Sequence, residues 1–177
     1  MQFLKILIIQ FTFLLGGRLM PLLAQGTPEF KVKAVFLYNF TQFVDWPPGT
    51  FATSQSPLII GILGTDPFGP YLQETVAGEK INGHPLIIIH YKAIEEVSGC
   101  HILFINTGNK RDKVMGGLRG RSILTVSDAT DFTKLGGMIR FFTKDNKMKL
   151  EINLEAAKAS NLAISSKLLR LAEIYKP

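Results

Sequence analysis

The sequence is poor in cysteine, since Cys100 is the only one among its 177 residues. A single thiol excludes an intramolecular disulfide, so packing must stabilise the fold. His101 follows Cys100, but consecutive strand residues point to opposite faces of a sheet, which argues against a catalytic Cys/His pair. We therefore predict that Cys100 is a buried structural thiol.

The common catalytic and cofactor motifs are also missing. There is no G-x-S-x-G, H-E-x-x-H or P-loop sequence, and Gly61 and Gly64 lack the spacing of a dinucleotide-binding fingerprint. The three histidines, His84, His90 and His101, do not have a spacing suited to a set of metal ligands. We predict no catalytic residue, no cofactor and no metal site, and hence a protein that acts by binding.

A concentrated stretch of one charge is absent as well. The chain has 20 Lys+Arg and 14 Asp+Glu, and loss of residues 1–26 would remove Lys5 and Arg18 and leave a net charge of +4. Small basic clusters occur only at residues 110–113 and 144–149. Nucleic-acid-binding domains concentrate such charge on one face, so we predict no nucleic-acid partner.

The N-terminus carries a segment typical of export. Lys5 precedes an apolar run over residues 6–15, and Pro21 interrupts the segment before the small-residue exit Ala24-Gln25-Gly26. The run is too short to span a bilayer. We predict a signal peptide over residues 1–26, cleaved near Ala24 to Gly26, and a single domain over residues 27–177 outside the cytoplasm. An uncleaved anchor is the alternative, because residues 19–23 extend the apolar character.

Short apolar runs predict the fold class. A helix is expected over residues 29–44, ended by Trp46-Pro47-Pro48, and a short helix within residues 67–76. Apolar runs without polar alternation indicate strands that are buried on both faces, as in a parallel sheet with helices on each side. Four such runs cover residues 58–63, 86–89, 102–105 and 123–126. We predict a three-layer α/β sandwich with a mostly parallel central sheet.

The C-terminal part has a different pattern. Residues 138–143 and 147–152 flank Lys144-Asp145-Asn146, whose composition suits a tight hairpin. Apolar and charged residues alternate in the second run, which predicts an antiparallel edge with one solvent-facing side. Asn153 is a suitable helix cap, and the apolar spacing after it predicts a terminal helix that continues to Tyr175.

The first predicted helix is apolar on most sides. One stripe contains Phe30, Ala34 and Leu37, and the other contains Val32, Phe36, Phe40 and Phe43. A helix of this kind must be covered on most sides, either within its own domain or by a partner. The candidates for a dimer or partner interface are Phe36, Phe40, Phe43 and Trp46, and the same residues suit a core.

Polar residues follow three of the predicted parallel strands. The carboxyl ends of parallel strands form the usual ligand crevice of an open α/β sheet. A small-molecule site there would use Thr65, Asp66, Asn106, Thr107, Ser127 and Asp128. Capping of helices is the alternative role for these side chains.

Several segments together resemble the YfiR/HmsC-like family. Residues 33–40 and 43–47 resemble its opening signature, and residues 153–172 resemble its terminal segment. Further blocks that resemble the family lie in the expected order at residues 61–64, 66–69, 100–105, 124–128 and 136–139. The resemblance extends over residues 33–172.

The resemblance implies a periplasmic regulator. Such a protein would bind the periplasmic sensor region of an inner-membrane diguanylate cyclase and repress it, lowering cyclic di-GMP and biofilm formation. It also implies a homodimer and release by an outer-membrane lipoprotein. Family members with disulfides respond to redox state, whereas Cys100 has no second cysteine to pair with in this chain. A periplasmic small-molecule sensor that uses the strand-end crevice is the alternative function.

Overall fold

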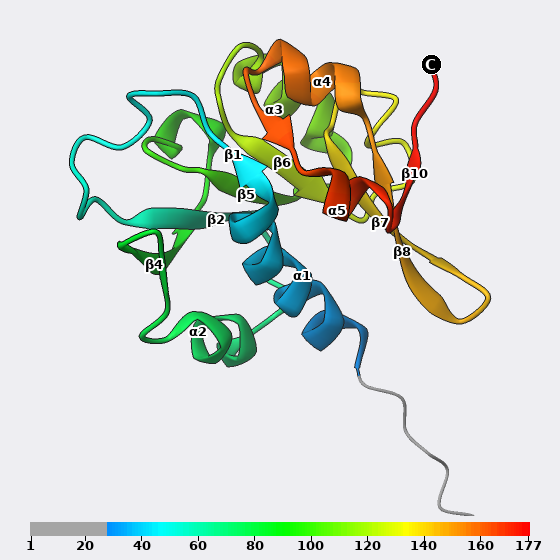
Figure 1. Cartoon of the computed structure of the whole chain (residues 1–177). Helices are drawn as coiled ribbons and strands as arrows, with labels where there is room; N and C mark the ends of the chain where they lie inside the picture. The colour runs from blue at the N-terminus through cyan, green and yellow to red at the C-terminus, as the bar shows by residue number, and fades with distance from the viewer. Residues whose placement is uncertain (1–27) are drawn as a thin grey trace, which may run out of the picture.

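The computed structural model describes residues 28–177, so the predicted signal peptide lies outside the described residues. Its main element is an eight-stranded sheet with the strand order β10-β8-β7-β6-β5-β2-β4-β3, and β1 and β9 form a separate two-stranded sheet (Figure 1). The helices, 3₁₀ turns (η) and strands follow in chain order as α1 Glu29–Phe43, β1 Val44–Asp45, β2 Leu58–Gly64, α2 Pro70–Val76, β3 Lys80–Ile81, β4 His84–Tyr91, η1 Ile94–Glu96, β5 Ile102–Asn106, η2 Gly108–Lys110, α3 Arg111–Leu118, β6 Leu124–Ser127, β7 Ile139–Lys144, β8 Lys147–Ile152, α4 Leu154–Ala159, β9 Ala163–Ile164, α5 Ser166–Leu169 and β10 Ala172–Ile174.

Strands β4, β2, β5 and β6 are parallel neighbours, as the four unbroken apolar runs predicted, and β7 of the hairpin adds a further parallel neighbour beside β6. Strand β5 shows why these runs do not alternate. Ile102 and Phe104 pack into the cluster beneath α1 and α2, whereas Leu103 and Ile105 pack into the cluster beneath α3. Helices therefore cover both faces of the sheet (Figure 1), and the predicted three-layer α/β fold with a mostly parallel sheet is confirmed.

The C-terminal hairpin is also confirmed, but β8 is not the predicted edge strand, because β10 pairs with it in parallel on its other side. Strands β7 and β8 pair antiparallel, with Lys144 opposite Lys147. Asp145 and Asn146 between them have φ angles of 51° and 56°. Two successive left-handed residues of this kind make the tight turn that matches the twist of paired strands, and Asp and Asn tolerate that conformation.

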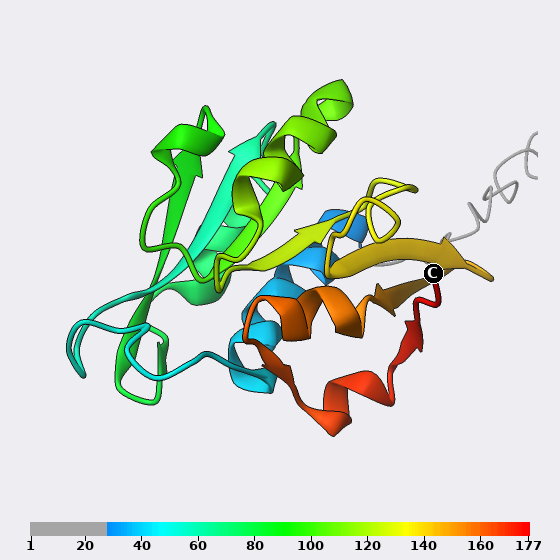
Figure 2. The same ribbon diagram turned by 90° about the horizontal axis from the view of Figure 1, so that it is seen from above.

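The prediction of one helix from Asn153 to Tyr175 is wrong. Asn153 does cap a helix, since its side chain accepts a hydrogen bond from the Ala156 N–H, but α4 ends at Ala159. Asn161 adopts a left-handed conformation with φ 57°, and the Leu162 N–H bonds back to the Ala157 carbonyl. This is a helix-terminating arrangement, and it sends the chain into β9, α5 and β10. In Figure 2 this segment, drawn in orange and red, changes direction repeatedly.

Helix α1 is anchored to the sheet by a buried cation. Lys33 is 7% exposed, and its Nζ lies 2.6 Å from Glu29 and 2.7 Å from Asp128, which follows β6. Burial alone would lower the pKa of Lys33, but its hydrogen bonds to Asp128 and Glu29 outweigh that effect and raise the pKa. The ammonium therefore stays charged and fixes the N-terminal half of α1 against the carboxyl end of β6.

Cys100 is buried, as predicted. Its Sγ donates a hydrogen bond to the Ile102 carbonyl at 3.0 Å, and burial raises the pKa of the thiol to about 12. The thiol is thus protonated and shielded from oxidants and from a second chain. No helix between residues 28 and 177 has the length and apolar character needed to cross a membrane.

Candidate functional site

The C-terminal end of α1 leads into a short strand that positions Trp46. Strand β1 follows α1 without a break and pairs antiparallel with β9. The Trp46 indole N–H then donates a hydrogen bond of 3.3 Å to the His101 carbonyl at the start of β5. The ring of Trp46 is therefore held by two segments that are distant in sequence, and its one polar atom is already paired.

Ring side chains stack beside Trp46 at the amino ends of the parallel strands. The Phe51 ring lies between two imidazoles, with centroids 3.8 Å from His84 and 4.5 Å from His101. Both pairs are nearly parallel, at 19° and 12°. Trp46 meets His101 edge-on, at 5.9 Å and 78°. The loop that carries Phe51 is thereby fixed to β4 and β5.

His101 is held in one tautomer. Only 4% of the residue is exposed, and its Nδ1 accepts a hydrogen bond of 3.0 Å from the Ile59 N–H, so the proton of the neutral ring is on Nε2. Burial, with a smaller contribution from the nearby His84, lowers the pKa of His101 from 6.5 to about 4. Protonation would add a buried charge and remove the acceptor for Ile59.

We expect His101 to make the fold acid-sensitive. Because its pKa is lower in the folded state than in the unfolded chain, its contribution to stability is complete above pH 6.5 and is lost as the pH falls through about 4. A shift of this size corresponds to up to about 3 kcal/mol. Urea unfolding between these pH values should show the loss in wild type and a clearly flatter profile in His101→Asn. If the free energy of unfolding of the two proteins changed equally with pH, His101 would not be the source of the acid sensitivity.

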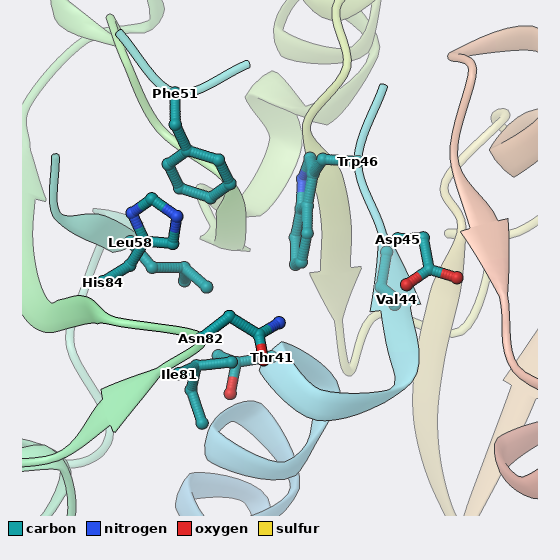
Figure 3. A pocket seen from close by; sticks show the side chains of 9 residues that line it. All are labelled: Thr41, Val44, Asp45, Trp46, Phe51, Leu58, Ile81, Asn82 and His84. Atoms are coloured by element: carbon teal, nitrogen blue, oxygen red, sulfur yellow. The ribbon is translucent and has the colours of Figure 1, made fainter. Parts of the chain in front are cut away.

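The ring stack borders a cavity of about 190 Å³ (Figure 3). Its lining residues come from the end of α1, β1 and the loop after it, the start of β2, and β3 with its turn into β4: Thr41, Val44, Asp45, Trp46, Phe51, Leu58, Ile81, Asn82 and His84. A second, more polar cavity of about 510 Å³ shares five of these residues and adds Tyr38, Gln42 and Lys80. We call the first the Trp46 cavity and the second the outer cavity. Together they form an open pocket within the size range of small-molecule sites.

The residues predicted for a crevice follow the carboxyl ends of the parallel strands, whereas the Trp46 cavity lies at their amino ends. Thr65 and Asn106 bond to each other, through the Thr65 N–H to the Asn106 carbonyl at 3.1 Å and the Asn106 amide to the Thr65 carbonyl at 3.0 Å. Asp66 accepts a hydrogen bond of 2.7 Å from the Phe68 N–H and lies 2.8 Å from His90 Nε2. These contacts tie the strand ends together.

The other three predicted residues of this edge have separate environments. Ser127 is buried and donates to the Ile105 carbonyl at 2.7 Å, while Asp128 pairs with Lys33 on α1. Thr107 borders a small cavity of about 150 Å³ between η1 and α3. Of five cavities in the described part of the chain, only this one is lined by any of the six predicted residues.

The four predicted interface residues also differ in how deeply they are buried. Phe40 has no exposed surface and stacks on Phe141 of β7 at 6.0 Å, so it belongs to the core and offers no contact area to a partner. Phe36 and Phe43 are half-buried against the same core. Trp46 is half-buried and lines the Trp46 cavity.

The ring stack was not predicted from the sequence. His84 begins β4 and His101 precedes β5, the two strands that flank β2, so their shared place at the amino ends of parallel strands was the available signal that they lie near each other. Phe51 lies in an irregular loop, where no sequence pattern places its side chain. The described residues hold no group of three or more His, Cys, Asp or Glu side chains arranged to bind a metal ion.

Comparison with known proteins gives one match. The family model described as YfiR/HmsC-like matches residues 30–173, which include nearly the whole described fold. No curated protein matches the sequence.

Proposed function

Because this chain belongs to the YfiR/HmsC-like family, whose members are periplasmic regulators of diguanylate cyclases, we propose that it binds and represses the periplasmic sensor region of an inner-membrane diguanylate cyclase. The observation that carries the proposal is the extent of the family match, residues 30–173. The family is regulatory and not catalytic. Repression would lower cyclic di-GMP and biofilm formation.

The proposal includes a cellular route and further partners. Residues 1–26 act as a signal peptide that is removed near Ala24 to Gly26, so the domain is released into the periplasm. There it forms a homodimer and is withdrawn from the cyclase by an outer-membrane lipoprotein. Repression requires that the domain bind the inactive state of the cyclase more tightly than the active state.

The solvent-facing side of α1 is the surface that we assign to the cyclase. It forms an apolar groove of about 200 Å³, which we call the α1 groove, lined by Lys31, Val32, Val35, Phe36, Asn39 and Tyr71. Val35 is 40% exposed, although most large apolar side chains of the described domain are covered. A small apolar surface with Lys31 and Asn39 at its rim has the composition of a protein-binding patch.

Substitution in the α1 groove should separate binding from folding. We expect Val35→Asp to weaken binding of the cyclase segment at least about tenfold, or about 1.4 kcal/mol, because it places a charge against an apolar contact. Its melting temperature should stay close to that of wild type, since Val35 is exposed. Leu171→Asp is the matched control, because Leu171 is 64% exposed at the other end of the chain. Loss of binding in Leu171→Asp alone would move the interface to the C-terminal segment.

The regulatory role itself is tested in cells. Deletion of the gene should raise cyclic di-GMP, and the wild-type gene should restore the original level. A mature domain that binds no cyclase segment, together with unchanged cyclic di-GMP after deletion, would overturn the proposal.

A further inference from the structure

A separate cavity of about 340 Å³, within the size range of small-molecule sites, is lined by residues of α3, α4, β6 and the loop before β7. We call it the α3–α4 cavity. Strand β6 pairs with β7 through Val126 and Ser127, its last residues. Before them, the Met138 N–H bonds to the side-chain oxygen of Thr125, at 3.1 Å, in place of a strand carbonyl. The sheet is therefore incomplete where Thr125 and Met138 line the cavity.

The walls of the α3–α4 cavity suit a hydrocarbon group. Leu135 and Ala156 are half-buried and Ala159 is exposed, so all three have accessible apolar surface. Leu135 lies in the segment 129–137, where four backbone N–H groups bond to carbonyls of the same segment around the fully buried Phe132. This part of the wall needs little reorganisation when a ligand enters.

Ser160 brings a buried hydroxyl without a partner to this cavity. The residue follows α4 and is 6% exposed, and its backbone N–H bonds to the Ala157 and Lys158 carbonyls. Its hydroxyl makes no hydrogen bond with any described residue, although buried polar groups are normally paired. The unpaired side-chain atoms that are sealed from solvent between residues 28 and 177 belong to Thr107 and Arg111. The Ser160 oxygen is thus unpaired but accessible, and Ser160 lines this cavity.

The polar side chains that line the cavity all offer donors. The Thr125 oxygen accepts from the Met138 N–H, and its own proton has no acceptor among the described residues. Arg119, which is exposed, is the only charged residue among those that line the cavity in the described part of the chain. A carboxylate accepts hydrogen bonds only and is therefore the matching group. The ends of α3 and α4 add partial negative charge here, but both helices are short and Arg119 carries a full charge.

From this arrangement we propose that the α3–α4 cavity binds the anion of a small apolar carboxylic acid. The Ser160 hydroxyl donates to the carboxylate, and Arg119 supplies the opposite charge. The hydrocarbon part of the acid lies against Leu135 and Ala156. This site does not depend on the proposed repression of a cyclase.

The first experiment compares two probes of nearly the same shape, para-fluorobenzoate and para-fluorobenzamide, which differ in charge at neutral pH. Titration of the mature protein, followed by fluorine NMR of the probe at constant ionic strength, should show saturable binding of para-fluorobenzoate. The amide should bind at least about tenfold more weakly, as expected for loss of a charge-assisted hydrogen bond. Absence of saturable binding of the benzoate, or equal affinity for the two probes, would overturn the proposal.

Substitutions then locate the bound probe. Ser160→Ala should weaken para-fluorobenzoate binding at least about tenfold, the effect of a lost hydrogen bond to a charged group. Its melting temperature should be no lower than that of wild type, because the hydroxyl has no partner in the fold to lose. Arg119→Gln should also weaken binding, while Arg170→Gln, at an exposed arginine after α5, should bind as wild type. Unchanged affinity or a lowered melting temperature in Ser160→Ala, or an equal effect of the two arginine substitutions, would contradict the assignment.

Discussion

Phe40→Ala is expected to lower the free energy of unfolding by about 3 to 5 kcal/mol, the range for removal of a fully buried phenylalanine. Phe40 is 0% exposed, and its ring contacts Phe36 at 6.1 Å and Phe141 at 6.0 Å. Truncation leaves a cavity between α1 and β7 that rigid neighbours on the sheet fill only in part. Urea unfolding at neutral pH measures the loss.

The same variant separates the two roles that the sequence left open for Phe40. At low temperature, where the variant remains folded, binding to the cyclase segment should be retained, because the side chain offers no surface to a partner. Val35→Ala on the exposed side of α1 is the control and should unfold close to wild type. A Phe40→Ala protein that melts normally yet loses its partner would place Phe40 at an interface and contradict the structure.

Gly64→Ala is expected to cost about 3 kcal/mol or more, because it combines backbone strain with a steric clash. Gly64 ends β2 with φ 93°, and a Cβ at this position would lie 2.2 Å from the backbone oxygen of Asn106 on the neighbouring strand. The clash is with main chain that is held in the sheet, so no side-chain rotation relieves it.

Gly108→Ala provides the matched comparison. Gly108 also has a left-handed φ, 56°, but a Cβ there meets no atom within 4 Å. It should therefore cost only about 1 kcal/mol, the strain of the backbone alone. Chemical denaturation of both variants gives the difference, and equal losses would show that Gly64 is required for its conformation and not for the close approach of β2 and β5.

The central sheet was predictable because its strands are buried on both faces. Continuous apolar runs such as residues 102–105 carry that information locally, and the Asp145-Asn146 turn is equally local. The C-terminal segment was not predictable in the same way. Its apolar spacing fits a helix, but Asn161 ends α4, and the later residues pair with β1 and β8, which are distant in sequence.

The candidate site was less predictable than the fold. The sequence showed that α1 is apolar on two sides, but whether Phe40 faces the sheet or solvent depends on how far the helix is rotated over β7. The ring stack requires a loop residue, Phe51, to enter between His84 and His101, which are brought together only by the pairing of β4 and β5 with β2. Nothing in the local sequence specifies that insertion.

The central claim is repression by contact, and cyclase activity measures it most directly. The membrane diguanylate cyclases of the source cell, expressed one at a time in vesicles with the periplasmic region accessible, would be assayed for cyclic di-GMP synthesis with and without the purified mature domain. We predict that the wild-type domain lowers the rate of at least one cyclase in a saturable manner, and that Val35→Asp requires at least about tenfold more protein for the same effect. Unchanged synthesis by every cyclase at saturating domain would contradict the account.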